Sequence, residues 1–289
     1  MIIEHLQKKY GAEITEKLVS NGELLAQNIK DKNESDQILV QDYISRLNDE
    51  LNLGMQIENT KWAFDFPGWL GSLGMNGSTN KKYFIIGLEP HVERYDYQIT
   101  YGLSKTTPKG EERFSIGEPE KFIINCEEDS SLIWSNLFHI LATEEEINEV
   151  SKNKNKELLI RFLSQFYITD LCHFAPQDKA KAIFDIKNWK SIRFNVANHF
   201  LKSEIEMVNP KVVIAQGNGV FSELSRILDL KEIESYSIEG TNWSLKKGIF
   251  NNGYKVLSLP HFGSKMNYNT FWRKHRDRVR KILIKQELV

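Results

Sequence analysis

The stretch KKYFIIGLEPH, from Lys81 to His91, decides how the rest of the chain is interpreted. Its short apolar run, YFII, is preceded by two lysines and is typical of a strand buried on both faces of a sheet. Gly87 permits a tight turn after the run, and Pro90 cannot continue the ladder of a strand. We therefore expect Glu89 and His91 in a loop at the carboxyl end of a central strand. Open α/β sheets bind their ligands at this position.

The bulk composition is that of an ordinary globular protein. The chain has 289 residues, 40% hydrophobic and 27% charged, enough for one large domain or a domain with a sizeable extension. No apolar run approaches the length of a membrane-spanning helix, and we expect no secretory signal in the first residues, which are partly acidic and have no long apolar core. We therefore expect a cytoplasmic protein with no membrane partner. A net charge of −1 gives no global attraction to nucleic acid, so DNA binding would need a local basic patch.

The two cysteines, Cys126 and Cys172, are far apart in sequence and form no CxxC pair. Two thiols alone cannot hold a zinc ion or an iron–sulfur cluster. We expect both to be buried free thiols in a reducing compartment, and we expect neither a metal nor another cofactor.

Residues 1–80 differ in character from the rest of the chain, and we interpret them as an N-terminal extension before an α/β domain at 81–289. Within residues 1–58, two segments carry apolar residues at helical spacing, and the turn and cap residues KNES separate them. From Trp62 to Thr79 the sequence is aromatic and glycine-rich without periodicity. We expect a packed loop there, leading into the first strand.

Three further apolar runs repeat the pattern of the first, and they lead to Asp170, Gly217 and His261. Four buried strands that alternate with helices predict a three-layer α/β/α fold with a central four-stranded parallel sheet. The last of these strands also belongs to a predicted β-hairpin that turns at Asn252-Gly253. Helices are expected at 130–150, 156–166, 188–210, 220–228 and from about residue 268.

Parallel strands share one direction, so the residues at their carboxyl ends lie along one edge of the sheet. Four residues occupy such positions: Glu89, Asp170, Gly217 and His261. Two carboxylates, a small residue and an imidazole at one edge are typical of a hydrolytic site.

In residue type and order these motifs resemble the uracil-DNA glycosylase superfamily. Its first motif has the form GxDPY, or GExPG in other branches; Gly87-Leu88-Glu89-Pro90-His91 fits it, followed by Tyr101-Gly102-Leu103-Ser104. Ile168-Thr169-Asp170 fits the strand end that reads the base. The family's PKVIxxxG pattern is matched from Pro210 to Gly217, and its last motif, HPSP, is matched loosely from Leu259 to Ser264.

This resemblance covers roughly residues 80–285 and implies a DNA N-glycosylase, which flips a base out of DNA into a pocket at the sheet edge. The glycosidic bond then breaks through an oxocarbenium-like transition state and leaves an abasic site. By the resemblance, the Glu89 carboxylate stabilises the sugar cation and orients water, and His261 donates to the leaving base. Apart from the resemblance, Glu89 reads as a loop carboxylate and His261 as a loop histidine.

Two departures from the family pattern bear on the identity of the base. Asp170 replaces a base-reading Asn, and an ionised carboxylate only accepts hydrogen bonds, which suits the exocyclic amine of cytosine. His91 replaces the Tyr that crowds the 5-position of the base in the strictest uracil enzymes. Together they favour a modified cytosine, as found in some phage DNA, and therefore a role in defence. Uracil removal in base-excision repair is the alternative, as is a purely structural Asp170 that caps its loop.

Further residues are candidates for contacts to DNA. The family places a Phe shortly after its first motif, where this chain has Ser104-Lys105-Thr106. Tyr101, Tyr95 or Phe174 would then stack on the base, unless they are core packing. The run from Trp272 to Lys281 is the densest in basic residues and is expected to hold phosphates, unless it is a solvated helix face. The phosphate candidates are Lys105, Gly217, Ser264, Lys265, Arg273 and Arg276.

Two other classes of function stay open at this point. A non-catalytic member of the superfamily would bind nucleic acid or a nucleotide without turnover, and the loose last motif and the missing Phe favour it. A nucleoside or nucleotide hydrolase on the same sheet would act on free nucleosides. For the glycosylase we expect DNA as the partner and a monomer as the active form.

Overall fold

The computed structural model of the chain describes residues 34–55, 62–64, 81–88, 133–153, 155–163, 165–176, 189–251, 253–260 and 266–287, with isolated residues before position 58. The chain separates into two compact units. The first comprises Met1–Asn80, Ile86–Ile116 and Tyr167–Asn209, and the second Lys81–Ile85, Gly117–Phe166 and Pro210–Val289. The described elements are α4 (Glu34–Glu50), β1 (Trp62–Phe64), β2 (Tyr83–Gly87), α7 (Ile133–Leu141), α8 (Glu144–Asn153), α9 (Lys156–Leu163), β3 (Phe166–Asp170), β4 (Phe174–Pro176), α11 (Trp189–Val208), β5 (Val212–Gln216), α12 (Asn218–Ile227), β6 (Lys231–Ser237), β7 (Ser244–Phe250), β8 (Tyr254–Leu259) and α13 (Met266–Lys285).

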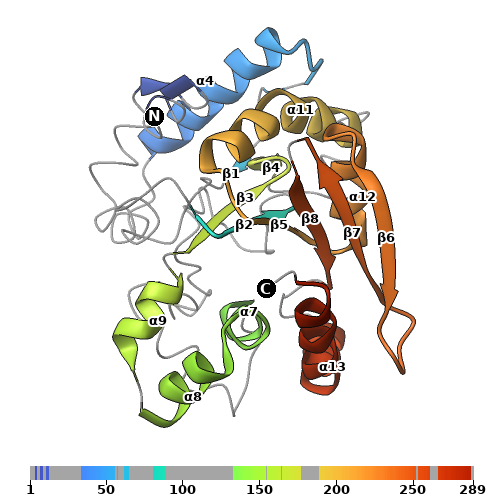
Figure 1. Ribbon diagram of the computed structural model, residues 1–289. Helices are drawn as coiled ribbons and strands as arrows, with labels where there is room; N and C mark the ends of the chain where they lie inside the picture. The colour runs from blue at the N-terminus through green and yellow to red at the C-terminus, as the bar shows by residue number, and fades with distance from the viewer. Residues whose placement is uncertain are drawn as a thin grey trace. The chain divides into compact units, whose positions relative to one another are not determined.

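The larger sheet has six strands in the order β3-β2-β5-β8-β7-β6. Strands β5 and β8 run parallel, with Gln216 beside Leu259 at their carboxyl ends. Strands β8, β7 and β6 are antiparallel neighbours, and β6 is one of the two edge strands (Figure 1). The predicted hairpin is confirmed, since Phe250 pairs with Tyr254 across its turn. The chain therefore has the predicted mixed α/β fold with a mostly parallel sheet.

Strand β2, formed by the apolar run YFII and Gly87, is buried along its whole length. At its start the Tyr83 amide donates to the Gln165 carbonyl at 3.0 Å. At its end the Leu171 amide donates to the Gly87 carbonyl, also at 3.0 Å. This is the pattern of a parallel ladder with β3, in which Gly87 lies beside Asp170.

The four predicted strands, β3, β2, β5 and β8, are extended to six by β7, the first strand of the predicted hairpin, and by β6, which was not predicted. The sequence of β6, KEIESYS, is exposed almost throughout, and it lacks the apolar face by which sequence reasoning recognises a strand. Its register on β7 shifts between Lys231 and Glu234, and Glu232 within this bulge has a φ of 50°. A bulge and charged side chains blunt an exposed sheet edge against further pairing.

The helix expected over residues 130–150 is two helices, α7 and α8. The Thr143 amide donates to the Glu146 Oε2 atom at 2.8 Å, and the Glu146 amide donates to the Thr143 Oγ1 atom at 3.1 Å. This reciprocal pair is a capping box, which starts a new helix within the expected one. The helices expected at 156–166, 188–210 and 220–228 correspond to α9, α11 and α12, and the C-terminal one to α13.

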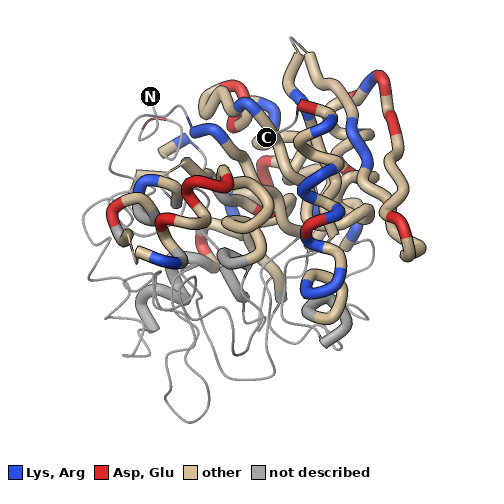
Figure 2. Tube along the Cα trace, turned by 60° about the horizontal axis from the view of Figure 1, so that its bottom comes forward, with Lys and Arg blue, Asp and Glu red and all other residues tan. Residues whose placement is uncertain are grey.

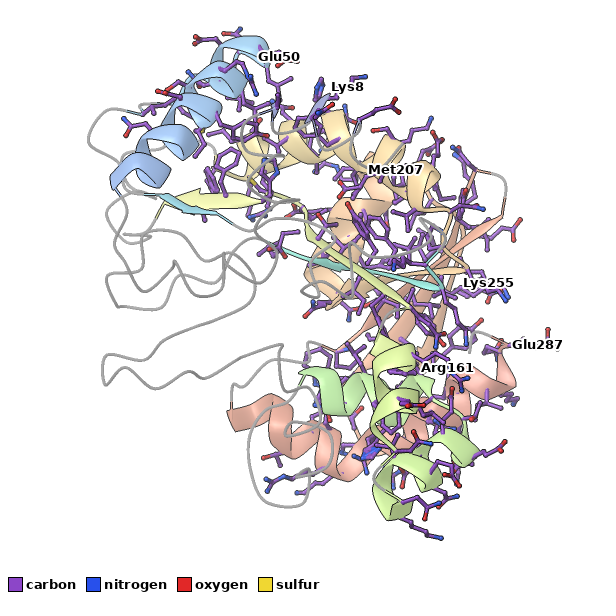
Figure 3. All side chains as sticks on the ribbon, turned by 90° about the vertical axis from the view of Figure 1, so that its left-hand side faces the viewer. Lys8, Glu50, Arg161, Met207, Lys255 and Glu287 are labelled. Atoms are coloured by element: carbon purple, nitrogen blue, oxygen red, sulfur yellow. The ribbon has the colours of Figure 1, made fainter. Side chains whose placement is uncertain are left out.

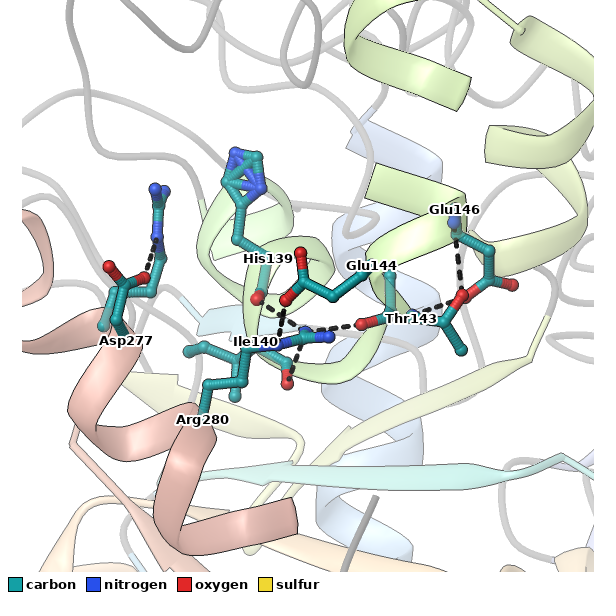
Figure 4. Close-up of polar contacts among 9 residues, drawn as sticks. His139, Ile140, Thr143, Glu144, Glu146, Asp277 and Arg280 are labelled. Atoms are coloured by element: carbon teal, nitrogen blue, oxygen red, sulfur yellow. Dashed lines mark hydrogen bonds and ion pairs between the residues drawn. The ribbon is translucent and has the colours of Figure 1, made fainter. Parts of the chain in front are cut away.

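The C-terminal end of α7 is bound by a side chain from α13. Arg280 is 9% exposed, and its Nε atom lies 3.1 Å from a Glu144 carboxylate oxygen. Its Nη1 atom donates to three α7-end carbonyls (Figure 4), those of His139, Ile140 and Ala142. These are carbonyls that the end of a helix leaves without intrahelical partners. Just beyond the C-terminal end of α13, Lys255 of β8 donates to the Glu287 carbonyl at 3.0 Å (Figure 3).

In the first unit, the N-terminal extension contacts the segment that follows β3. The expected loop from Trp62 onward begins with β1, which pairs antiparallel with β4, so this part of the loop prediction was wrong. His199 of α11 lies 3.6 Å from a carboxylate oxygen of Glu50, at the end of α4 (Figure 3). None of the described helices is long and apolar enough to cross a membrane.

Candidate active site

The loops that follow β2 and β3 begin side by side. The Leu171 amide donates to the Gly87 carbonyl at 3.0 Å, and the Cys172 amide donates to the Leu88 carbonyl at 3.3 Å. Backbone hydrogen bonds therefore hold the first residues after β3 against the end of β2. Glu89 follows the tied pair directly in the sequence.

Asp170 lies across the backbone of Gly87. A Cβ atom added to Gly87 would lie 1.9 Å from the Asp170 Oδ1 atom and 3.2 Å from its Cγ atom. No real Cβ tolerates the shorter of these contacts, so the absence of a side chain at Gly87 leaves the space that the carboxylate fills. Asp170 is half-buried at the carboxyl end of β3. It therefore stands at a strand end, as the sequence predicted.

Phe174, a candidate for base stacking, has no exposed surface. Its ring packs edge-on against the rings of His173 at 5.3 Å and Trp189 at 6.0 Å. Its backbone pairs with Phe64 of β1. A stacking platform needs an open ring face, so this burial argues for core packing and against the stacking role.

Gly217 directly follows β5 and is the N-cap residue of α12. Its φ of 98° lies in a region that residues with a Cβ rarely adopt, which explains the glycine. Its amide donates to the Leu259 carbonyl at 2.6 Å and so joins the ends of β5 and β8. The Gly217 amide is therefore already used within the sheet, which argues against its predicted contact to a phosphate. Beside it, the Ser258 hydroxyl donates to the Asn218 side-chain oxygen at 2.7 Å.

Helix α13 carries the predicted basic run, and its Lys and Arg residues recur along the helix (Figure 2). Arg273 is exposed, whereas Arg276 is half-buried, with its Nε atom 4.0 Å from an Asp277 carboxylate oxygen. The predicted run contains three of four exposed cations that are spaced by four, three and four residues, but sequence reasoning did not group them as one helix face: Lys274, Arg278, Lys281 and Lys285. Their helical spacing is visible in the sequence and could have identified them.

The half-buried side of α13 faces a neutral histidine. Burial, together with the positive charges of Arg276 and Arg280, lowers the pKa of His139 to about 4. Asp277 acts in the opposite direction but does not reverse the shift. His139 is therefore uncharged at neutral pH.

Most of the residues predicted for catalysis, base binding and phosphate contacts lie outside the described residues. These are Glu89, His91, Tyr95, Tyr101, Lys105, His261, Ser264 and Lys265. The residues that immediately precede two of these loops are described: Leu88 is exposed and Pro260 is buried.

Sequence reasoning correctly expected Cys172 to be a buried free thiol, but it missed that the whole segment after Asp170 is buried. The segment from Leu171 to Ala175 is buried at every position, and His173 within it bonds to Tyr43 of the N-terminal extension. The apolar character of LCHFA was the available signal that the chain stays in the core after β3. Nothing in the sequence pointed to Tyr43 as the partner.

The chain is an α/β protein with a mostly parallel sheet. Polar residues stand at the carboxyl ends of its strands, where open α/β sheets bind their ligands. The family model described as Uracil DNA glycosylase superfamily matches residues 75–284, and the chain belongs to this superfamily, whose fold is a three-layer α/β/α arrangement. No curated protein was found to match the chain. Membership supports DNA glycosylase activity and a DNA substrate in general.

Proposed function

We propose that this protein is a DNA N-glycosylase that excises a modified cytosine and leaves an abasic site. Family membership supports the reaction class. Asp170, which stands across Gly87 at the end of β3, carries the choice of base. An ionised carboxylate can accept a hydrogen bond from the cytosine N4 amine, but it has no hydrogen to offer the O4 atom of uracil.

The two catalytic roles are assigned to Glu89 and His261, because these residues match the superfamily motifs. As the sugar develops positive charge, the Glu89 carboxylate stabilises it and orients the attacking water. As the base leaves with negative charge, His261 donates a hydrogen bond to it. Both groups act where charge develops, which is the most effective place for a catalytic group.

Base selection also involves the 5-position. His91 stands where the strictest uracil enzymes have a Tyr that crowds this position. A base with a 5-substituent is therefore admitted, and Tyr101 is assigned to stack on the flipped base.

Phosphate contacts are assigned mainly to α13. Arg273 and Arg276 lie in its basic run, and Lys105, Ser264 and Lys265 are further candidates for phosphate contacts. Because the net charge is only −1, this local patch has to supply the attraction to DNA.

A cytoplasmic monomer with this activity would serve as a defence protein against phage. Unmodified cytosine is abundant in host DNA, so its removal would damage the host. A modified cytosine confined to invading DNA is free of this cost. In this proposal residues 81–289 form the glycosylase domain, and residues 1–80 are an extension to it.

The substrate test uses DNA oligonucleotides that carry uracil, cytosine, 5-hydroxymethylcytosine or its glucosylated form, and measures abasic sites by alkaline cleavage. We expect cleavage at a modified cytosine. Cleavage at uracil alone would support the repair alternative and overturn the choice of base.

The enzyme is separated from a non-catalytic binder by Glu89→Gln and His261→Ala. We expect each to lower the single-turnover rate by about 100-fold or more while DNA binding is retained. A native protein that binds all the oligonucleotides and cleaves none would favour the binder. Release of base from free nucleosides would favour the nucleoside hydrolase.

A further inference from the structure

Two buried polar side chains join the N-terminal extension to the loop after β3. Tyr43 of α4 is 4% exposed, and His173, three residues after Asp170, is 1% exposed. The Tyr43 hydroxyl and the His173 Nε2 atom share a hydrogen bond of 2.8 Å, and their rings lie 5.6 Å apart. Burial raises the pKa of the Tyr43 hydroxyl, which therefore keeps its proton at neutral pH. Buried polar groups are costly unless bonded, so this bond restrains both side chains.

The short connection from His173 back to Asp170 has little freedom to move. Leu171 and Cys172 are both buried, and their amides donate to the carbonyls at the end of β2, at 3.0 and 3.3 Å. His173 itself packs against the ring of Phe200. A displacement of His173 is therefore passed on to these two hydrogen bonds, because close-packed neighbours leave no slack to absorb it.

The extension holds the same segment at a second place. Strand β1, Trp62–Phe64, pairs with β4, Phe174–Pro176, directly after His173. Both contacts come from residues before position 75, where the match to the superfamily begins. The loop after β3 is thus held by a part of the chain that the family match does not include.

We infer that Tyr43 is a positioning residue of the candidate active site: through His173 it fixes the Leu171–Cys172 connection and, with it, the carboxylate of Asp170. The inference rests on the proposed function, because it assigns Tyr43 to base selection. It also gives the N-terminal extension a task, which is to complete the base-reading loop. The Tyr43 ring packs in the core, and its hydroxyl, through His173, helps to position Asp170.

The first test needs no substrate. Tyr43→Phe keeps the ring and removes only the hydroxyl. We expect the Leu171 and Cys172 amide hydrogens to exchange with solvent about five- to tenfold faster. Loss of the Tyr43–His173 hydrogen bond lowers the free energy of the local opening that permits exchange by the net contribution of one hydrogen bond. Tyr236→Phe is the matched control, since it removes a hydroxyl that is bonded to Glu234 on the exposed strand β6. Unchanged exchange in Tyr43→Phe would overturn the inference.

The second test measures single-turnover excision of the modified cytosine found by the substrate panel. We expect Tyr43→Phe to lower the maximal rate by about 10- to 100-fold at unchanged DNA affinity, as a misplaced group does. His173→Gln, which retains a polar atom near the Nε2 position, should keep more activity than His173→Leu. A rate loss that appears equally in an Asp170→Ala background would overturn the inference, since Tyr43 would then act independently of Asp170.

The two levels of failure are distinguishable. If Asp170→Ala retains native activity and base preference, the proposed base-reading role fails, while the exchange measurement still reports whether Tyr43 holds the loop. If Asp170→Ala loses activity and Tyr43→Phe does not, the proposed function stands and the positioning role is wrong.

Discussion

The Oδ1 atom of Asp170 occupies the space that a methyl group on Gly87 would need, 1.9 Å from the position of such a Cβ. The three atoms nearest to that position all belong to the Asp170 carboxyl group. Asp170 is therefore the reason for a glycine here, and the pairing of β2 with β3 brings the two together. A strand-ending glycine thus serves the placement of a carboxylate.

Gly87→Ala is expected to displace the Asp170 carboxylate. We expect a loss of about 1–3 kcal/mol in the free energy of unfolding, measured by urea denaturation, as for other overpacked sites. The single-turnover excision rate should also fall, by more than the loss of folded protein explains, because the displaced carboxylate reads the base. Gly219→Ala is the matched control, because no atom lies within 4 Å of a Cβ at that position.

The same contact predicts non-additivity. In an Asp170→Ala background the Gly87→Ala change should cost little, since the atoms that obstruct the new methyl group are gone. An equal cost in both backgrounds would show that something other than Asp170 excludes a side chain from this position.

Asp170→Asn is expected to change which base is preferred. An amide both donates and accepts, so it suits uracil as well as cytosine. The ratio of kcat/KM for modified cytosine to that for uracil should fall by about 10- to 100-fold, the worth of one good base contact. Parallel single-turnover assays on the two oligonucleotides measure this ratio, with the exposed Asp229→Asn as control. An unchanged ratio would make Asp170 structural.

The strands of the candidate site could be predicted because each is an apolar run with a glycine or an aspartate at or directly after its carboxyl end, as at Gly87, Asp170 and Gly217. The capping box at Thr143 was also visible, but apolar periodicity continues through it and indicated one helix. Strand β6 has no buried face and therefore leaves no alternating pattern. The contact between Tyr43 and His173 joins residues 130 positions apart, and such a pairing leaves no local trace in the sequence.

Arg280→Met is expected to destabilise the protein by about 2–4 kcal/mol, measured by urea denaturation. The methionine fills much of the volume but leaves the α7 carbonyls without their donor. Arg280→Lys should recover only part of the loss, because one ammonium cannot reproduce the planar donor group. Lys281→Met, an exposed neighbour on α13, should change stability by less than about 0.5 kcal/mol. Similar losses for Met at both positions would contradict the capping role.

His139 is expected to make the protein sensitive to mild acid. Its folded pKa of about 4 lies below its unfolded value. Between about pH 6.5 and pH 4 the unfolded chain therefore binds a proton that the folded chain does not, and stability falls as the pH falls. The free energy of unfolding should drop by about 2 kcal/mol more in the native protein than in His139→Gln between pH 7 and pH 5. Parallel pH profiles for the two proteins would show that His139 is not held neutral.

The basic helix is expected to control the salt dependence of DNA binding. Each phosphate contact contributes a slope of about −0.9 to a plot of log K against log salt concentration. Arg273→Gln with Arg276→Gln should therefore flatten the slope by nearly 2, measured by fluorescence anisotropy with a duplex oligonucleotide. Lys190→Gln with Lys202→Gln, two exposed cations of α11, is the charge-matched control and should leave the slope unchanged.

The exposed face of α13 offers a second arrangement, which Lys274→Gln with Lys281→Gln tests. Helical spacing places these lysines on a different side of α13 from Arg276. The phosphate backbone of a DNA duplex would therefore contact either the lysine pair or the arginine pair more closely. We expect the arginine pair to dominate, because guanidinium groups bind phosphate through two hydrogen bonds. A slope that changes only in the lysine variant would move the DNA contact to the exposed face. If neither variant changes the slope, α13 does not contact DNA, because released counterions must appear in the slope wherever a cation meets a phosphate.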